Sequence, residues 1–166
     1  MKTISLLLIL KGNLTRILLI ALFIITSSGL SAQSAPSGTL IITFTDIRSD
    51  IGEIVAGIYS AEDQWIYDPE YSHKWTKEEL KDGKLKVEIP DLPYGIYAIS
   101  VLDDEDKSNS MNYFLGLPRE GWGMSTNPSF FKLKAPKYEE CAIELDCPGI
   151  SFEINMNYLN KRKKVK

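Results

Sequence analysis

The sequence predicts an all-β protein, an antiparallel β-sandwich of about seven strands with one short helical turn. Three observations predict this class. Short segments alternate apolar and polar residues with period two, turn residues separate these segments, and a single stretch carries a helix signal. A parallel sheet is disfavoured, because parallel strands need crossover connections that are usually helices.

Six segments have the alternation typical of half-buried strands. In the first, Leu40, Ile42 and Phe44 share one face, while the β-branched residues Thr39, Ile41, Thr43 and Thr45 occupy the other. The predicted strands are residues 39–45, 54–59, 84–89, 97–101, 141–146 and 150–158. Pro148-Gly149 favours a type II turn, so we expect the last two strands to form a hairpin. The two prolines in residues 90–95 predict a corner after the third strand.

The helix signal lies at Thr76-Lys77-Glu78-Glu79. Thr76 and Glu79 have the spacing of a capping box, in which each side chain bonds the backbone amide of the other residue. Asp82-Gly83 ends the segment, so the helical turn predicted here is short.

The first 32 residues have the order of a secretory signal peptide. Lys2, Lys11 and Arg16 precede the apolar run 17–25, and small and polar residues follow it up to Ala32. The run is shorter than the roughly 20 residues that span a bilayer, so we expect cleavage after Ala32, with an uncleaved anchor as the alternative. The expected location is periplasmic or extracellular, with no membrane span after cleavage.

Removal of this leader leaves a length that suits one domain. We expect a linker at 33–37, the sandwich at 38–160 and a solvated basic tail at 161–166. The whole chain has 19 basic and 22 acidic residues, and the leader has no acidic residue, so the mature chain is mildly acidic. This balance does not favour nucleic acid as a partner, because such binding depends on Lys and Arg that displace counterions.

The two cysteines are expected to be free thiols. On a straight strand, Cys141 and Cys147 lie roughly 20 Å apart at about 3.3 Å per residue, well beyond the roughly 7 Å that a disulfide tolerates. Cys141 is expected to be a small core residue on the same face as Ile143 and Leu145. A bend near Cys147 that closes the disulfide is the alternative.

Motifs for catalysis are weak, so an enzyme is disfavoured and no cofactor is expected. His73 is the single histidine, and its neighbours form no nucleophile motif, so we expect a solvated loop histidine rather than part of a triad. A hydrolase remains a minor alternative. It requires Asp103, Asp104 or Glu120 to converge with His73.

The acidic run 103–106 has two interpretations. Asp103, Asp104 and Asp106 are weak candidates for calcium ligands, since calcium prefers several oxygen donors from one loop. The alternative is a hydrated acidic turn. The loop has neither the glycine nor the terminal glutamate of an EF-hand, so no metal is predicted outright.

The stretch 115–128 contains the candidate ligand-binding residues Glu120, Trp122 and Asn127. Its glycines and prolines preclude a long helix, and Gly121 and Gly123 allow a large ring to approach the backbone closely. In the favoured interpretation Trp122 plugs one end of the sandwich, while Glu120 and Asn127 tie the loop by hydrogen bonds. In the other, Trp122 is an exposed platform for a sugar or a peptide.

Four motifs resemble those of a bacterial exported family known as domain of unknown function 2141. They are residues 38–40, 48–50 with Gly52, 91–99, and 116–125 with Asn127. The resemblance implies a transthyretin-like or prealbumin-like sandwich, of the broader immunoglobulin-like kind, that is exported and has no established activity. Family members often carry an Asp-, Asn- and Gly-rich loop that suggests a cation site, and Asp103 and Asp104 match its start.

The function expected from these features is that of an exported, non-enzymatic binding or accessory module of the bacterial envelope. Its partner is expected to be an unknown envelope protein or a glycan. A purely structural or assembly component is the alternative. A calcium-dependent binding module, or the hydrolase mentioned above, comes third.

Overall fold

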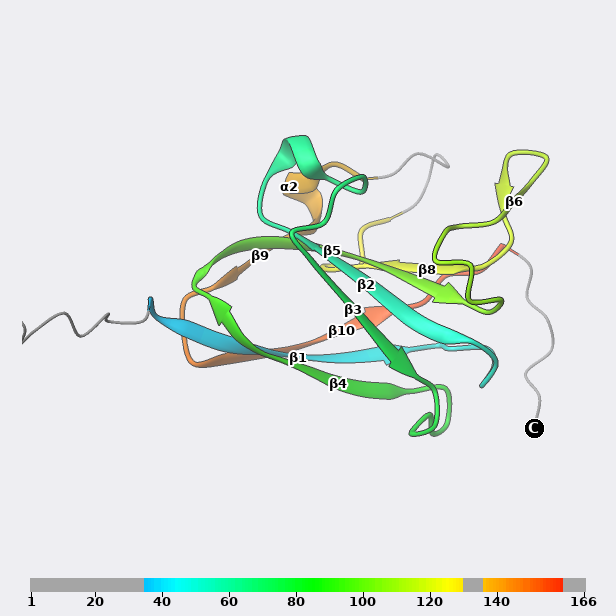
Figure 1. The fold of residues 1–166 in the computed structure, drawn as a ribbon, viewed down its shortest axis with the longest axis horizontal. Coiled ribbons are helices and arrows are strands. Elements are labelled where there is room, and N and C mark those ends of the chain that lie inside the picture. Colours follow the sequence, from blue (N-terminus) through cyan, green and yellow to red (C-terminus); the bar gives the residue numbers. More distant parts are fainter. Residues whose placement is uncertain (1–34, 130–135, 160–166) are drawn as a thin grey trace, which may run out of the picture. The chain divides into compact units, whose positions relative to one another are not determined.

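The computed structural model describes residues 35–129 and 136–159, whose two larger β-sheets pack around one main core (Figure 1). The predicted leader, the first two linker residues and the basic tail lie outside the described residues. Within these residues, no helix is both long and apolar enough to cross a lipid bilayer.

The smaller sheet has the order β10-β1-β4. Its strands are β1 (Ser37–Thr45), β4 (Leu85–Pro93) and β10 (Gly149–Asn155). Leu40, Ile42 and Phe44 of β1 are fully buried, as the alternation predicts.

The larger sheet has the order β3-β2-β5-β8, and β9 pairs with the start of β5. Its strands are β2 (Glu53–Tyr59), β3 (Tyr71–Thr76), β5 (Gly95–Asp104), β8 (Gly121–Met124) and β9 (Ala142–Leu145). Three small elements complete the described chain. They are the 3₁₀ helix η1 (Glu62–Gln64), the helix α2 (Tyr138–Cys141), and a hairpin of β6 (Tyr113–Phe114) and β7 (Leu117–Pro118).

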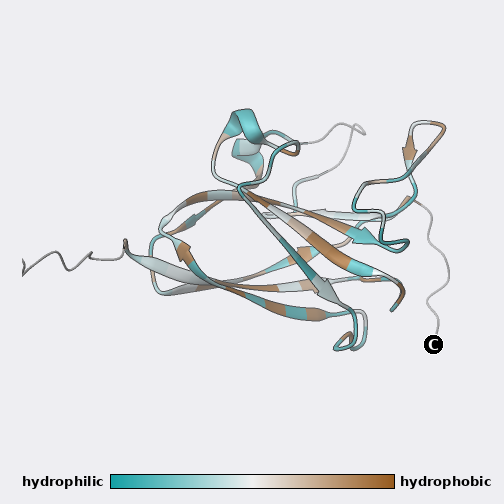
Figure 2. Cartoon of the chain, in the orientation of Figure 1, coloured by the Kyte–Doolittle hydropathy of each residue, from teal (hydrophilic) through white to brown (hydrophobic). Residues whose placement is uncertain are grey.

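Apolar side chains from both sheets meet in the main core, which confirms the predicted all-β sandwich class. Ile54 and Ile99 of the larger sheet pack with Ile42, Val87 and Ile154 of the smaller sheet. Figure 2 shows apolar residues alternating with polar ones along the strands.

One strand pair departs from the antiparallel prediction. β1 and β10 run parallel, from Thr39 opposite Gly149 to Thr45 opposite Asn155. No crossover helix is needed, because the rest of the domain connects these two strands. The other strand pairs described are antiparallel.

The predicted hairpin of residues 141–158 is wrong. β9 pairs with β5 in the larger sheet, whereas β10 pairs with β1 in the smaller one, so the chain crosses between sheets near Pro148. The Pro148 carbonyl accepts a hydrogen bond from the Thr39 amide at 3.0 Å. Alternation predicted which face of each strand is buried, but it carries no information about which strand lies alongside.

The helical turn predicted at 76–79 is also wrong. Thr76 ends β3, opposite Glu53, and residues 77–79 form a turn. The side chain of Lys77 is buried and binds Asp103 and two backbone carbonyls. This anchoring of Lys77 in the interior prevails over the weak helical preference of the segment.

The predicted corner at residues 90–95 is smaller than expected, because β4 continues through both prolines to Pro93. β4 lies at the edge of its sheet, where a residue without an amide donor is tolerated. Asp91 has a φ of 58°, and the register with β1 shifts between Gly38 and Leu40.

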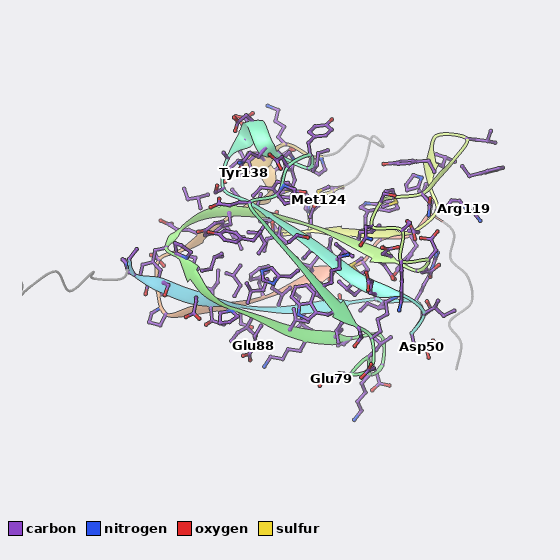
Figure 3. All side chains as sticks on the ribbon, in the orientation of Figure 1. Asp50, Glu79, Glu88, Arg119, Met124 and Tyr138 are labelled. Carbon is purple, nitrogen blue, oxygen red and sulfur yellow. The ribbon has the colours of Figure 1, made fainter. Side chains whose placement is uncertain are left out.

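Both cysteines are free thiols, as predicted. Cys141 is fully buried, but its predicted neighbours are wrong. It ends α2 and belongs to a second apolar cluster with Tyr59, Trp65, Ala98 and Met124, while Leu145 belongs to the main core. Tyr138 also packs against this cluster. Figure 3 shows it close to Met124.

Candidate functional site

A groove of about 540 Å³ lies on the outer face of the larger sheet. Its floor comes from residues that alternate with the core residues of β2, β3 and β5. Ser72 and Ser100 are small, so their strands leave room above the sheet, while the Tyr59 ring lies over Gly57. The walls come from the segments before β3 and after β5, including Pro69 and Met111.

Three aromatic side chains, Tyr59, Tyr113 and Trp122, contribute to the lining of the groove. The Tyr59 hydroxyl lies 3.2 Å from the Ser100 hydroxyl, and burial raises the pKa of Tyr59, so this phenol stays neutral and serves as a hydrogen-bonding group. Apolar groups such as Val55 supply the rest of the surface.

Trp122 is half-buried and lies on β8, where it pairs with Leu102. The backbone amide of Trp122 donates to the backbone carbonyl of Asn157 at 3.0 Å, and the backbone amide of Asn157 donates to the Trp122 carbonyl at 2.7 Å. These bonds fix the backbone beneath the indole ring, which lines the groove.

Glu120 and Asn127 tie the ends of β8 to neighbouring segments, as the structural interpretation expected. The buried Glu120 carboxylate accepts the amides of Glu105 and Asn112, each at 3.1 Å. Asn127 donates to the Glu153 carbonyl at 2.9 Å and accepts the Asn155 amide at 2.7 Å. Both residues therefore position Trp122.

Asp104, Asp106 and Glu120 bring one carboxylate oxygen each to within 4.8 Å of one another. Asp104 is fully buried and accepts the amides of Ser108 at 3.0 Å and Asn109 at 2.7 Å, so the loop after β5 folds around it. Burial, with the charges of Asp106 and Asp104, raises the pKa of Glu120, because its negative form is penalised there. The donors are all hard oxygens, which fits calcium in type.

Asp103 does not belong to this carboxylate cluster. Its side chain is fully buried, accepts hydrogen bonds from Lys77 and the Tyr158 hydroxyl, and faces the sandwich interior. Of the three predicted calcium candidates, Asp104 and Asp106 come together and Asp103 does not. Sequence reasoning missed the role of Glu120 as their neighbour, since a separation of many residues gives no local signal.

The alternative of a hydrated acidic turn is also wrong for most of the run. Beside the two buried aspartates, Glu105 forms a two-point ion pair with Arg48, with both contacts at 2.7 Å. The hydrogen bond and charge of Arg48 lower the pKa of Glu105. Asp106 is the exposed member of the run, and it accepts hydrogen bonds from the Asn112 side chain at 2.7 Å and from the Ser108 amide, which it shares with Asp104.

His73 lies on β3, not in a loop, and its ring stacks on Trp75 with centroids 5.7 Å apart. The bonds described above direct Asp103 to Lys77 and Tyr158, and Glu120 to backbone amides. A catalytic arrangement with His73 finds no support in these contacts.

A family model described as an uncharacterized protein conserved in bacteria (DUF2141) matches residues 42–151. This chain belongs to the DUF2141 family. The DUF2141 match contains the whole carboxylate cluster and all of the groove lining except Leu159. Comparisons with curated proteins and with solved structures give no match. The transthyretin-like variety of sandwich stays a prediction for this DUF2141 member.

Proposed function

We propose that the chain is an exported, non-enzymatic binding module of the bacterial envelope, and that its ligand occupies the groove on the larger sheet. The observation that carries this proposal is the groove itself. Its volume of about 540 Å³ is in the range of small-molecule sites, and strands of the larger sheet form its floor.

The lining favours a ligand with an apolar face and a hydrogen-bonding rim. Trp122 and Tyr113 offer ring surfaces, and Ser72 and Ser100 offer hydroxyl groups at the floor. A sugar ring of an envelope glycan has both features, because its C–H groups pack on aromatic rings and its hydroxyls form hydrogen bonds.

Quenching of tryptophan fluorescence by acrylamide tests this site. We expect acrylamide to quench Trp122 in the unliganded protein and soluble peptidoglycan fragments to protect it. Trp122→Phe identifies the signal, since Trp65 and Trp75 remain in that variant. An indole at position 122 that acrylamide never reaches would favour the purely structural alternative.

Blocking the groove supplies a second test. Ser72→Phe places a ring on the groove floor, where the ligand is proposed to bind. We expect this variant to bind the fragments at least about tenfold more weakly, because the ring keeps the ligand from part of its apolar contact with the groove. Thr76→Phe on the same exposed face of β3 is the matched control, because Thr76 does not line this groove. Equal affinities for the two variants would place the glycan elsewhere.

Export follows from the predicted leader and has its own test. The mass of the chain recovered from the periplasm or the medium should correspond to loss of residues 1–32. Full-length protein confined to the cytoplasm would contradict the envelope location.

The carboxylate cluster supports a second candidate, a calcium-dependent form of the same module. Asp104, Asp106 and Glu120 would hold the ion, which would offset two of their three negative charges and brace the loop that walls the groove. We expect millimolar calcium to raise the melting temperature of the wild type and to leave that of Asp104→Asn unchanged. If the melting temperature of the wild type does not change with calcium, this candidate function is excluded.

A further inference from the structure

The hairpin Tyr113–Pro118 has no charged side chain and projects from the sandwich, and hydrophobic residues lie on it (Figures 1 and 2). We call it the apolar hairpin. Tyr113, Phe114, Leu115 and Leu117 expose 65%, 63%, 86% and 45% of their surfaces. An added Cβ at Gly116 would meet no atom within 4 Å, so the tip has open space around it.

The tip combines two locally unfavourable features. Leu115 and Gly116 have φ values of 50° and 77°, the conformation of a two-residue turn in which both central residues are left-handed. Asn or Asp is usual in the first position, whereas leucine is strained there and gains nothing from exposure to water. A leucine held in this unfavourable backbone conformation and exposed to water does not help the chain to fold. Such backbone strain is typical of a residue that has a functional role, such as binding.

Polarity changes in layers from the tip to the base. Leu115 and Gly116 form the tip, Phe114 pairs with Leu117, and Tyr113 pairs with Pro118. The next pair is polar, since the Arg119 amide donates to the Asn112 carbonyl at 2.9 Å and the Arg119 side chain is exposed at the base (Figure 3). Aliphatic groups therefore lie outermost, the aromatic layers follow, and a cation lies behind them.

This order matches the polarity gradient of a lipid surface. Aromatic residues and arginine favour the headgroup level, while aliphatic groups favour the acyl chains. Three layers at about 3.3 Å each reach about 10 Å, the depth to which interfacial elements enter a bilayer. Tyr113 and Pro118 lie on the side of the hairpin that lines the groove, whereas Phe114 and Leu117 lie on the other side and, like Leu115 at the tip, do not line it. The aliphatic tip and this outer side are therefore the parts that an apolar medium can surround.

We propose that the apolar hairpin inserts into the interfacial region of a phospholipid bilayer and holds the domain at the membrane surface. This inference does not depend on the groove. Because the hairpin also forms one wall of the groove, the attached domain keeps that site beside the membrane.

A polarity-sensitive fluorophore at the tip tests the insertion. In a Cys147→Ser background, Leu115→Cys is labelled, since Cys141 is buried. The chain is expressed with its own amino terminus, and its mass records whether the leader is present. We expect a blue shift on addition of vesicles of phosphatidylethanolamine and phosphatidylglycerol, and none for a label at Ile96→Cys, an exposed apolar position on β5. No shift at position 115 would overturn the proposal.

Vesicle flotation provides the second measurement. Phe114→Ser with Leu115→Ser should reduce the vesicle-bound fraction at least about tenfold, because two exposed apolar groups no longer enter the bilayer. Ile96→Ser, which carries the same amino terminus, should bind like the wild type. A blue shift without vesicles that grows with protein concentration, together with a dimer in analytical ultracentrifugation that the double variant abolishes, would assign the hairpin to a second copy of the chain instead.

Discussion

The side chains of Lys77 and Asp103 are both fully buried and form an ion pair between the turn after β3 and the end of β5. The Lys77 ammonium also donates to the carbonyl of Ile51 at 2.6 Å and to that of Ser49 at 3.2 Å. Three acceptors thus surround the ammonium. Such a pair contributes little compared with apolar residues of the same shape, but the loss of one partner leaves a buried charge.

Lys77→Met should therefore lower the free energy of unfolding by about 3–5 kcal/mol, because it leaves the Asp103 carboxylate unpaired in the interior. Urea denaturation measures this change. Lys86→Met, at an exposed position of β4, is the matched control and should change stability little. The double variant Lys77→Met with Asp103→Leu should recover part of the loss. Equal stabilities of Lys77→Met and Lys86→Met would show that the pair is not needed.

The two thiols should differ sharply in reactivity. Burial raises the pKa of Cys141 to about 12, whereas Cys147 is partly exposed. Since the thiolate is the nucleophile, iodoacetamide should modify Cys147 and leave Cys141 intact in the folded protein. Mass spectrometry should find one adduct under native conditions and two in denaturant. Two adducts in the native protein would contradict the burial of Cys141.

At the scale of elements, the two glycines of β8 allow β10 and the chain after it to approach closely. A Cβ at position 121 would overlap the Tyr158 ring, and one at position 123 would lie 2.6 Å from the Ile154 side chain. The sequence pattern predicted close approach of a large ring to this backbone. The ring that approaches Gly121 belongs to Tyr158, which also bonds Asp103.

Gly121→Ala should displace Tyr158 and destabilise the fold by about 1–3 kcal/mol, the usual cost of overpacking a core. Thermal or urea unfolding measures the change. Gly116→Ala in the apolar hairpin is the control, because the added methyl group meets no atom there. Its positive φ adds only a small backbone strain. Unchanged stability of Gly121→Ala would mean that Tyr158 can rotate away at no cost.

The positions and buried faces of β1, β2, β4, β5, β9 and β10 could be predicted from the sequence, whereas β3, β8 and the strand partners could not. The alternation in β1 and β10 depends on local burial, which a periodic pattern records directly. The pairing of β9 with β5 depends on contacts far apart in sequence. The turn at Lys77 was misassigned for the same reason, because its partner Asp103 is 26 residues away.

The candidate site was predicted only in part. Trp122 was selected for its unusual glycine neighbours, and the structure places it on the groove. The groove floor was missed because Gly57, Ser72 and Ser100 are ordinary small residues that acquire meaning only when their strands lie side by side. Likewise, Glu120 joins Asp104 and Asp106 through the chain reversal at the apolar hairpin.

At the scale of the whole molecule, the Arg48–Glu105 pair links the loop after β1 to the loop after β5 and makes stability depend on pH. The pKa of Glu105 is lowered from 4.5, so as pH falls the unfolded chain takes up this proton first. The contribution is present above about 4.5 and is lost as pH falls through the lower folded value. Asp103 and Glu120, whose pKa values are raised by burial, act in the opposite sense.

We therefore expect the wild type to be more stable than Glu105→Gln at neutral pH, and this advantage to shrink as pH falls below 4.5. Urea denaturation of both proteins at a series of pH values measures the difference, in which the contributions of Asp103 and Glu120 largely cancel. A difference that stays constant down to the acid transition would contradict the role of the pair.

The parallel pairing of β1 with β10 has a consequence for biosynthesis. The first strand to leave the ribosome finds the neighbour on one of its sides only when the last strand has been made. Until then its amides and carbonyls on that side remain open to any extended polypeptide nearby. A nascent chain that stalls before residue 149 thus presents an unpaired strand edge that is prone to aggregation. A chaperone that binds and shields this edge would raise the yield of native protein.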